Sequence, residues 1–118
     1  MKNQHIYLND IIEAMNKIEI FIKTLTFDEF QKDDKTSSAV IRKFEINGEA
    51  TKNINDDIRK NYPEIPWKEM TGMRDKLIHS YFGIDYKLVW TTIKDSLPKT
   101  KTLLIKILED RKSTPSAK

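Results

Sequence analysis

The sequence predicts an all-α protein, a bundle of four to five antiparallel helices. Apolar residues recur at spacings of three and four along most of the chain, which is the repeat of helices that bury one face. Three glycines and four prolines are too few for the frequent turns of an all-β domain. No stretch reads convincingly as a strand, and the connections are short, which favours antiparallel neighbours.

Size and composition indicate one soluble globular domain. The 118 residues include 33% charged and 38% hydrophobic residues. We expect a single helical domain over residues 1–112 and a flexible tail over residues 113–118. The absence of cysteine excludes disulfides and thiolate metal sites.

Charge and hydropathy narrow the class of partner. The net charge of +3, from 21 Lys plus Arg against 18 Asp plus Glu, is too small to identify a nucleic-acid binder by itself. No apolar run approaches the roughly 20 residues that cross a bilayer, and the N-terminus lacks a signal-peptide pattern. We therefore expect a cytoplasmic protein with no membrane partner.

The first helix is predicted over about residues 8–25. Its apolar stripe consists of Leu8, Ile11, Ile12, Met15, Ile18, Ile22 and Leu25. Ile20 and Phe21 lie off this stripe, and they indicate a second buried face, either in the core or against a second copy of the chain.

A polar connection or a frayed helix end is predicted from Phe27 to Lys35, because D-E-F-Q-K-D-D is rich in charge. The hydroxyls of Thr36, Ser37 and Ser38 are candidate N-caps for the next helix. The apolar stripe of that helix consists of Val40, Ile41, Phe44, Thr51 and Ile54.

Gly48 falls in the middle of this second long helix, where a glycine costs about 1 kcal/mol relative to alanine. Such a glycine usually has a packing reason, and we expect another helix backbone to approach it closely. Arg42, Glu45 and Glu49 lie within reach of one another on the same helix. They form either a solvated ion-pair face or a group beside the functional site.

Two prolines separate this helix from the central one. Residues 55–62, N-D-D-I-R-K-N-Y, fit one or two helical turns. Pro63 and Pro66 must then interrupt the helix, because proline disfavours helical geometry in the residue before it. Pro66 and Trp67 are the predicted start of the central helix.

Gly83 is the predicted end of the central helix, and Asp85 is the predicted N-cap of the next one. Pro98 is expected to kink or end that helix before a final one begins. The apolar stripes of these last two helices consist of Tyr86, Val89, Trp90, Ile93 and Leu97, then Leu103, Leu104, Ile107 and Leu108.

The central stretch from Trp67 to Asp85 holds the candidate functional site. At about 100° per residue, one helix face collects Trp67, Met70, Met73, Leu77, Ile78 and Tyr81. Arg74 falls in the middle of this apolar stripe. Its guanidinium cannot lose its proton, so it needs an anion, a partner chain or a water-filled cleft.

Arg74 and His79 together suit metal-independent RNA cleavage. An imidazole can move the proton of the attacking 2′-hydroxyl or of the departing 5′-oxygen, and a guanidinium can hold the phosphate. A structural arginine beside a helix-end histidine is the plainer alternative. On an ideal helix the two side chains diverge by about 140°. Either the helix loosens near His79 or a second chain completes the site, and we favour a homodimer.

Other kinds of site find little support in the sequence. Two histidines far apart offer no metal site, and three isolated glycines offer no phosphate loop. Ser80, His79 and Asp75 contain the residue types of a catalytic triad. The glycine pattern of a strained nucleophile elbow does not accompany them.

Residues 74–81, R-D-K-L-I-H-S-Y, resemble the R-x4-H-x-Y motif of the HepT-like toxins, a branch of the HEPN superfamily. Over about residues 8–108, further blocks of that family follow in order: Ile41-Arg42, Gly48-Glu49-Ala50, Pro63-x-x-Pro66-Trp67, Met73-Arg74-Asp75, and Asp85 with Val89-Trp90. One departure is Asn47, where the family usually has an apolar residue before G-E-A.

The resemblance implies an all-helical homodimer whose two motif helices form a composite cleft. It also implies a metal-independent ribonuclease that is the toxin of a toxin–antitoxin pair and needs no cofactor. Arg74 and His79 would cleave the RNA, and Asp75 would support them. The implied antitoxin is a minimal nucleotidyltransferase of the MntA type, which would transfer AMP from ATP to Tyr81. The plainer interpretation of Tyr81 is an interface aromatic residue.

A second class of function stays open. The chain could be a non-enzymatic helical partner subunit of a nucleotidyltransferase, one that binds a nucleotide or presents a substrate. Arg74 would then hold a phosphate without chemistry. The intact motif favours the ribonuclease, whereas the small net charge favours the binding subunit.

Overall fold

The computed structural model describes residues 3–80 and 83–113, and every regular element in these ranges is helical. The predicted all-α bundle is confirmed. The long helices are α1 (Gln4–Ile22), α3 (Asp34–Lys52), α5 (Trp67–Ile78) and α7 (Leu97–Ser113). The short elements are α2 (Phe27–Lys32), α4 (Asp56–Asn61), α6 (Tyr86–Thr91) and the π-helical turn η1 (Thr92–Ser96).

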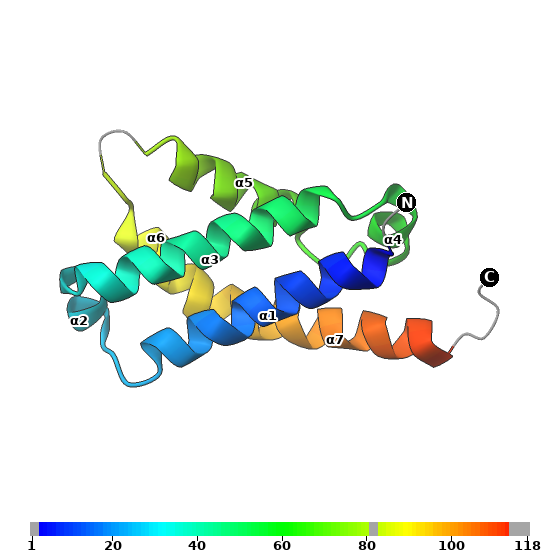
Figure 1. Ribbon diagram of the computed structural model, residues 1–118, viewed down its shortest axis with the longest axis horizontal. Coiled ribbons are helices and arrows are strands. Elements are labelled where there is room, and N and C mark those ends of the chain that lie inside the picture. The colour runs from blue at the N-terminus through cyan, green and yellow to red at the C-terminus, as the bar shows by residue number, and fades with distance from the viewer. Residues whose placement is uncertain (1–2, 81–82, 114–118) are drawn as a thin grey trace.

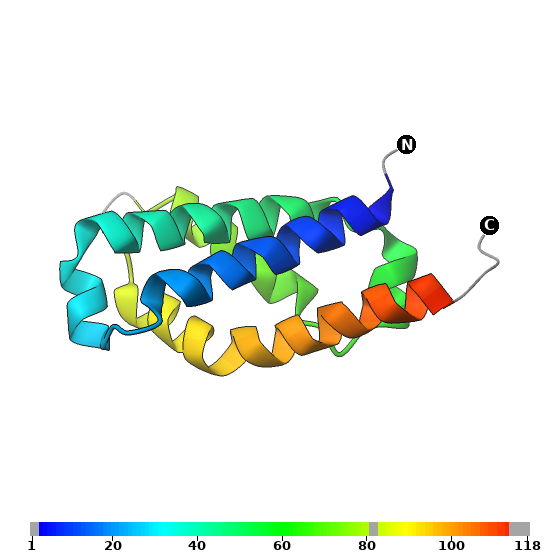
Figure 2. The same cartoon turned by 60° about the horizontal axis from the view of Figure 1, so that its bottom comes forward.

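Helix α3 lies in the middle of the bundle, with α1 on one side and α5 on the other (Figure 1). Helix α7 runs beside α1, and consecutive long helices run in opposite directions (Figure 2). None of the helices in the described ranges is long and apolar enough to cross a membrane.

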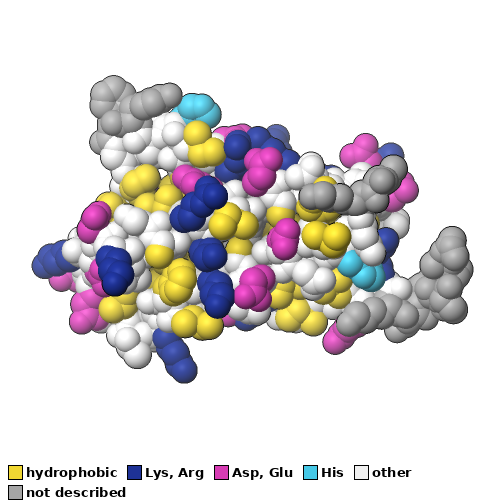
Figure 3. All heavy atoms as spheres, viewed as in Figure 1, with side chains coloured by type: hydrophobic (Ala, Val, Ile, Leu, Met, Phe, Trp, Pro, Cys, Tyr) yellow, Lys and Arg dark blue, Asp and Glu magenta, His cyan; other side chains and the backbone are white. Residues whose placement is uncertain are grey.

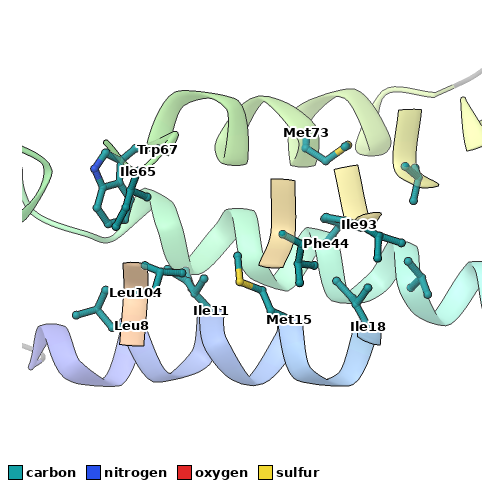
Figure 4. Packing of buried hydrophobic residues seen from close by; sticks show 14 of the residues in the cluster. Leu8, Ile11, Met15, Ile18, Phe44, Ile65, Trp67, Met73, Ile93 and Leu104 are labelled. Carbon is teal, nitrogen blue, oxygen red and sulfur yellow. The ribbon is translucent and has the colours of Figure 1, made fainter. Parts of the chain in front are cut away.

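The core runs along the contact of α1 with α3 and α7 (Figure 4). Its most completely buried apolar side chains are Leu8, Ile11, Ile18, Phe30, Val40, Ile58, Val89, Leu104 and Ile107. Of the two residues off the first stripe, Phe21 packs partly buried against this core. Ile20 is 63% exposed and is not a core residue of the protomer.

The prediction of a polar connection or a frayed helix end from Phe27 to Lys35 is wrong, because Phe27–Lys32 forms the capped helix α2 and α3 begins at Asp34. The Thr26 hydroxyl accepts a hydrogen bond from the Glu29 backbone N–H (3.2 Å), and the Glu29 carboxylate accepts one from the Thr26 N–H (2.9 Å). This capping box satisfies two backbone donors at the helix start. Phe30 is fully buried and packs against the rings of Tyr86 and Trp90, so tertiary contact stabilises a helix only six residues long.

The N-cap of α3 is Asp33, three residues earlier than predicted. Its carboxylate accepts from the Thr36 backbone N–H (3.0 Å) and from the Thr36 hydroxyl (2.8 Å). Thr36 therefore supports the cap from inside the helix, and Ser37 is buried in the first turns. At the other end of this region, α1 stops at Ile22, short of the predicted residue 25.

The central helix begins where the prolines predict and ends early. Helix α5 starts at Trp67 directly after Pro66, and the helical turns predicted before the prolines correspond to α4. The helix stops at Ile78, five residues before Gly83, which has φ +124°, a left-handed value that suits glycine. The predicted Asp85 cap is confirmed, since its carboxylate accepts from the Leu88 N–H (3.0 Å).

Pro98 does not end the last helix. The proline ring nitrogen has no N–H to donate to a helical hydrogen bond. The five residues of η1, directly before α7, form a π-helical turn in which the Leu97 N–H donates to the Thr92 carbonyl. The chain therefore stays helical from Tyr86 to Ser113 with a local change of pitch. The predicted tail beyond Ser113 lies outside the described residues.

Candidate functional site

Arg74 lies on α5 at a close approach of that helix to Gly48 on α3. A Cβ atom placed on Gly48 would clash with the Cβ of Arg74, and it would lie 3.2 Å from the backbone carbonyl oxygen of Met70. Only glycine permits this approach. The prediction that Gly48 admits a neighbouring helix backbone is confirmed, and the neighbour is the turn that carries Arg74.

Two carboxylates hold the Arg74 guanidinium, one from each helix. Nη2 lies 3.2 Å from Oε1 of Glu49 on α3, and Nη1 lies 3.0 Å from Oδ1 of Asp75 on α5. The Lys52 ammonium lies 3.4 Å from the same Asp75 oxygen. The Arg74 side chain is 24% exposed, so a mostly buried cation is positioned by anions at the surface.

The electrostatics of Asp75 follow from this arrangement. The hydrogen bond from Arg74 lowers the pKa of the Asp75 carboxyl below its usual 3.8, and Lys52 adds to the effect. Asp75 is therefore ionised at neutral pH and fixes the Arg74 side chain against α5.

His79 is the C-cap of α5, and its ring is exposed. The backbone N–H of His79 donates to the Asp75 carbonyl (3.2 Å), and ring Nδ1 lies 2.9 Å from the same oxygen. A carbonyl oxygen can only accept, so Nδ1 carries a proton in this bond, and Nε2 is the ring nitrogen left for other partners. Arg74 and His79 therefore meet at Asp75, one at its side chain and the other at its backbone.

Two further residues of the predicted site region are Tyr81 and Ser80. Tyr81 lies outside the described residues. Ser80 is described, and its hydroxyl donates to the backbone carbonyl of Lys76 (2.6 Å). That bond gives the hydroxyl a structural role at the end of the helix, and it does not support a catalytic triad. In the described parts of the chain, no three His, Asp or Glu side chains gather where they could hold a metal ion.

Arg74 opens onto a surface groove of about 410 Å³ between α1, α3 and α5. The groove is lined by Tyr7, Asp10, Arg42, Glu45, Ile46, Glu49, Ala50, Asn53, Arg74 and Ile78. Both Lys and Arg and Asp and Glu side chains lie on this face, and some of the Lys and Arg side chains gather in a short row near its middle (Figure 3).

Arg42, Glu45 and Glu49 on α3 were predicted to form either a solvated ion-pair face or a group beside the candidate site, and the three residues divide between these two arrangements. Arg42 and Glu45 form an ion pair (3.3 Å) at the solvated edge of the groove. Glu49 instead belongs to the site, since it contacts Arg74 directly. Lys52 was not among the predicted site residues. It lies one helical turn beyond Gly48, so the helical repeat places it on the face that meets α5.

The fold and this constellation define a class: an all-α bundle with a clamped arginine and an exposed histidine at the end of one helix. The chain belongs to the HepT-like ribonuclease family, because the family model described as “Ribonuclease HepT-like” matches residues 11–107.

Individual relatives cover nearly the whole chain. “Probable ribonuclease HepT” of Thermococcus cleftensis is 52% identical over 102 residues, 86% of this chain and 93% of the relative. “Putative RNase MJ0127” of Methanocaldococcus jannaschii is 45% identical over 109 residues, 92% of this chain and 90% of the relative. “Putative RNase TTE0752” of Caldanaerobacter subterraneus subsp. tengcongensis is 38% identical over 112 residues, 95% of this chain and 100% of the relative. No solved structure matches the chain significantly.

Proposed function

We propose that this protein is a metal-independent endoribonuclease of the HEPN type and the toxin of a toxin–antitoxin pair. The observation that carries the proposal is the convergence of Arg74 and His79 on Asp75. Family membership and the ribonuclease names of the relatives support the same activity.

The proposed reaction is transfer of the RNA phosphate to the neighbouring 2′-oxygen. A bond forms between the 2′-oxygen and phosphorus, and the bond from phosphorus to the 5′-oxygen breaks. His79 moves a proton through Nε2, either from the 2′-hydroxyl or to the departing 5′-oxygen. Arg74 donates to the phosphate oxygens and neutralises their growing charge, which is typically worth roughly 3–4 kcal/mol of transition-state stabilisation. Asp75 is a positioning residue, because it holds Arg74 and His79 and need not touch the RNA.

The full site would be shared between two copies of the chain. Arg74 faces the groove between α1, α3 and α5, while His79 projects at the end of α5. Ile78 lies between them in sequence, lines the groove and is 41% exposed. A two-fold dimer through this face would bring the same surface of both copies together. Arg74 of one copy could then meet His79 of the other.

Tyr81 is the proposed regulatory position. It follows His79 by two residues in sequence, and an AMP group transferred there from ATP would add a bulky anion that competes with the RNA phosphate. The proposed partner is a minimal nucleotidyltransferase antitoxin of the MntA type, and the proposed location is the cytoplasm.

The substitution His79→Ala tests the activity. Cleavage of RNA by the purified protein should fall by roughly 10²–10⁴-fold, with unchanged helicity, because the His79 ring is exposed. His5→Ala, at the other histidine of the chain, is the matched control and should cleave normally. Cleavage by the parent should survive exhaustive chelation.

Two results would contradict the ribonuclease. Undiminished cleavage by His79→Ala would remove His79 from the mechanism. A parent protein that binds a nucleotidyltransferase tightly and cleaves no RNA would instead support the non-enzymatic binding subunit.

A further inference from the structure

A second cavity of about 310 Å³ lies on the other flank of α5, away from the groove that holds Arg74. Its walls come from α1, α3 and α5 on one side and from α6, η1 and α7 on the other. Most of the lining is apolar: Met15, Phe44, Pro66, Met70, Met73, Leu88 and Leu97. Met73 on α5 lies across from Phe44 and Met15 (Figure 4). The size and the lining are those of a pocket for a small ligand.

Asn47 sets this cavity apart from a packing defect. The residue is only 3% exposed, and its side-chain amide has no hydrogen-bond partner among the described residues. No fully enclosed side-chain nitrogen or oxygen in those ranges lacks a partner, so the amide of Asn47 must reach the open space of the cavity it lines. The amide therefore directs its hydrogen-bonding capacity into the cavity, where a bound ligand can take the place of water.

Three hydroxyl residues join Asn47 in the cavity lining, Thr92, Ser96 and Thr100, and the Thr92 hydroxyl donates to the Leu88 carbonyl (2.8 Å). Thr100 is 4% exposed, and neither its hydroxyl nor that of Ser96 has a hydrogen-bond partner in the described part of the chain. Ser96 belongs to the π-helical turn, an irregularity that is frequent at functional sites. The cavity therefore offers a donor-and-acceptor amide and two hydroxyls without a protein partner, those of Ser96 and Thr100, within mainly apolar walls.

Gly72 widens the cavity on the α5 side. A Cβ atom placed there would meet nothing within 4 Å, so no neighbour in the protomer requires a glycine. In mid-helix this glycine weakens α5 compared with alanine. It leaves room for an occupant beside Met73, in contrast to Gly48, whose space α5 fills.

We propose that this cavity binds an adenine base, in a free nucleotide or in an unpaired RNA adenosine. An asparagine amide can pair in two directions with the adenine edge that carries N6 and N7. Methionine thioethers and the Phe44 ring pack well on the faces of a flat heterocycle. The charged residues of the lining, Glu69 and Lys76, are exposed, so the interior suits an uncharged base while Lys76 can meet an attached phosphate. This site uses neither Arg74 nor His79 and extends beyond the proposed ribonuclease function.

Calorimetry on the full chain with adenosine as the titrant tests the proposal. Asn47→Leu keeps the branched shape of the side chain and removes both hydrogen bonds, so adenosine should bind about tenfold more weakly or worse. Gly72→Phe fills the cavity and should abolish binding. Purine riboside, which lacks the 6-amino group, should bind the parent about tenfold more weakly than adenosine.

Two further ligands distinguish the sources of the base. AMP should bind at least as well as adenosine if the ligand is a free nucleotide. A short oligoadenylate should bind better than AMP if the ligand is RNA, and this arm is measured on His79→Ala so that no cleavage intervenes. Binding is read without catalysis, so an inactive ribonuclease would leave this proposal standing.

Three outcomes would overturn the adenine site. The first is no heat of binding to the parent at millimolar adenosine. The second is equal affinity in the parent and in a folded Asn47→Leu variant, with folding checked by circular dichroism. The third is a dimer, seen by sedimentation, that Gly72→Phe dissociates while adenosine binds neither form, because the cavity would then be filled by a second copy.

Discussion

Gly48 and Arg74 lie opposite each other at the α3–α5 crossing, where a Cβ on Gly48 would clash with the Arg74 Cβ and lie 3.0 Å from its Cγ. The glycine therefore determines how closely α5 approaches α3, and with it the position of the guanidinium between Glu49 and Asp75. The packing of two helices and the position of the proposed catalytic cation are one feature of the molecule.

The substitution Gly48→Ala should destabilise the protein by about 1–3 kcal/mol, because the helices must separate to admit a methyl group. Gly72→Ala is the matched control: its Cβ meets no atom within 4 Å, so the better helix former should stabilise the fold by up to about 1 kcal/mol. Urea unfolding measures both free energies. Equal effects of the two substitutions would show that helix propensity, and not the contact with Arg74, decides at Gly48.

Glu49→Gln should raise the affinity of the protein for RNA several-fold. The Glu49 carboxylate pairs with Arg74 and competes with the RNA phosphate for it, and glutamine removes that charge. Fluorescence anisotropy in a His79→Ala background measures binding without cleavage, and added salt should reduce the difference. Glu45→Gln, which removes a partner of Arg42, is the control and should change binding less. Weaker binding by Glu49→Gln would mean that Glu49 positions Arg74 for the phosphate.

Stability should fall in acid through two aspartates. Hydrogen bonds from the Thr36 backbone N–H and hydroxyl lower the pKa of Asp33, and the hydrogen bond from Arg74 lowers that of Asp75. A carboxyl whose pKa is lower in the folded state stabilises the fold fully above its unfolded pKa, near 3.8 here. This stabilisation is lost as the pH falls through the folded-state value.

Asp33→Asn tests the first of these carboxyls. Asparagine also caps helices but does not titrate, so the free energy of unfolding of the variant should decline less steeply below pH ~4 than that of the parent. Asp57→Asn, at an exposed aspartate of α4, serves as the control. Parallel pH profiles for Asp33→Asn and the parent would exclude the cap as a source of acid lability.

Ile78→Glu should dissociate the proposed dimer without unfolding the chain. Ile78 is 41% exposed and lines the groove beside Arg74, so a charge there would be buried only in the dimer. Ile105→Glu is the matched control, because Ile105 on α7 is similarly exposed, at 39%, and lies outside this groove. Analytical ultracentrifugation should find the Ile78 variant monomeric and the Ile105 variant dimeric. A parent that sediments as a monomer would rule out the shared cleft.

Tyr81 should be the tyrosine that the partner nucleotidyltransferase modifies. Incubation with that enzyme and ATP should add adenylyl mass to the parent, seen by intact mass spectrometry, and RNA cleavage should fall in parallel. Tyr81→Phe should prevent both changes, while Tyr86→Phe should not. An adduct that persists in Tyr81→Phe would place the modification elsewhere.

Much of the fold could be predicted because helix formation is recorded in local spacing. The apolar repeats, the proline break before Trp67 and the Asp85 cap each depend on a few neighbouring residues. The sequence analysis does not predict helix α2, although the T-x-x-E capping box of this helix is visible in the sequence. The many charged residues of this stretch favour a connection, whereas the helix depends on the burial of Phe30 against the rest of the fold. The π-helical turn was missed because Pro98 alone predicts an interruption and not how the backbone accommodates it.

The sequence by itself determined an all-α bundle, the anomalous Arg74 within an apolar stripe, and the family motif that joins Arg74, His79 and Tyr81. Only the tertiary structure decided that Glu49 and Asp75 clamp Arg74, that Lys52 joins them, and that Asn47 lines a separate cavity. The physical reason is that side-chain periodicity fixes the face on which a residue lies, whereas ion pairs and cavities depend on how two helices cross.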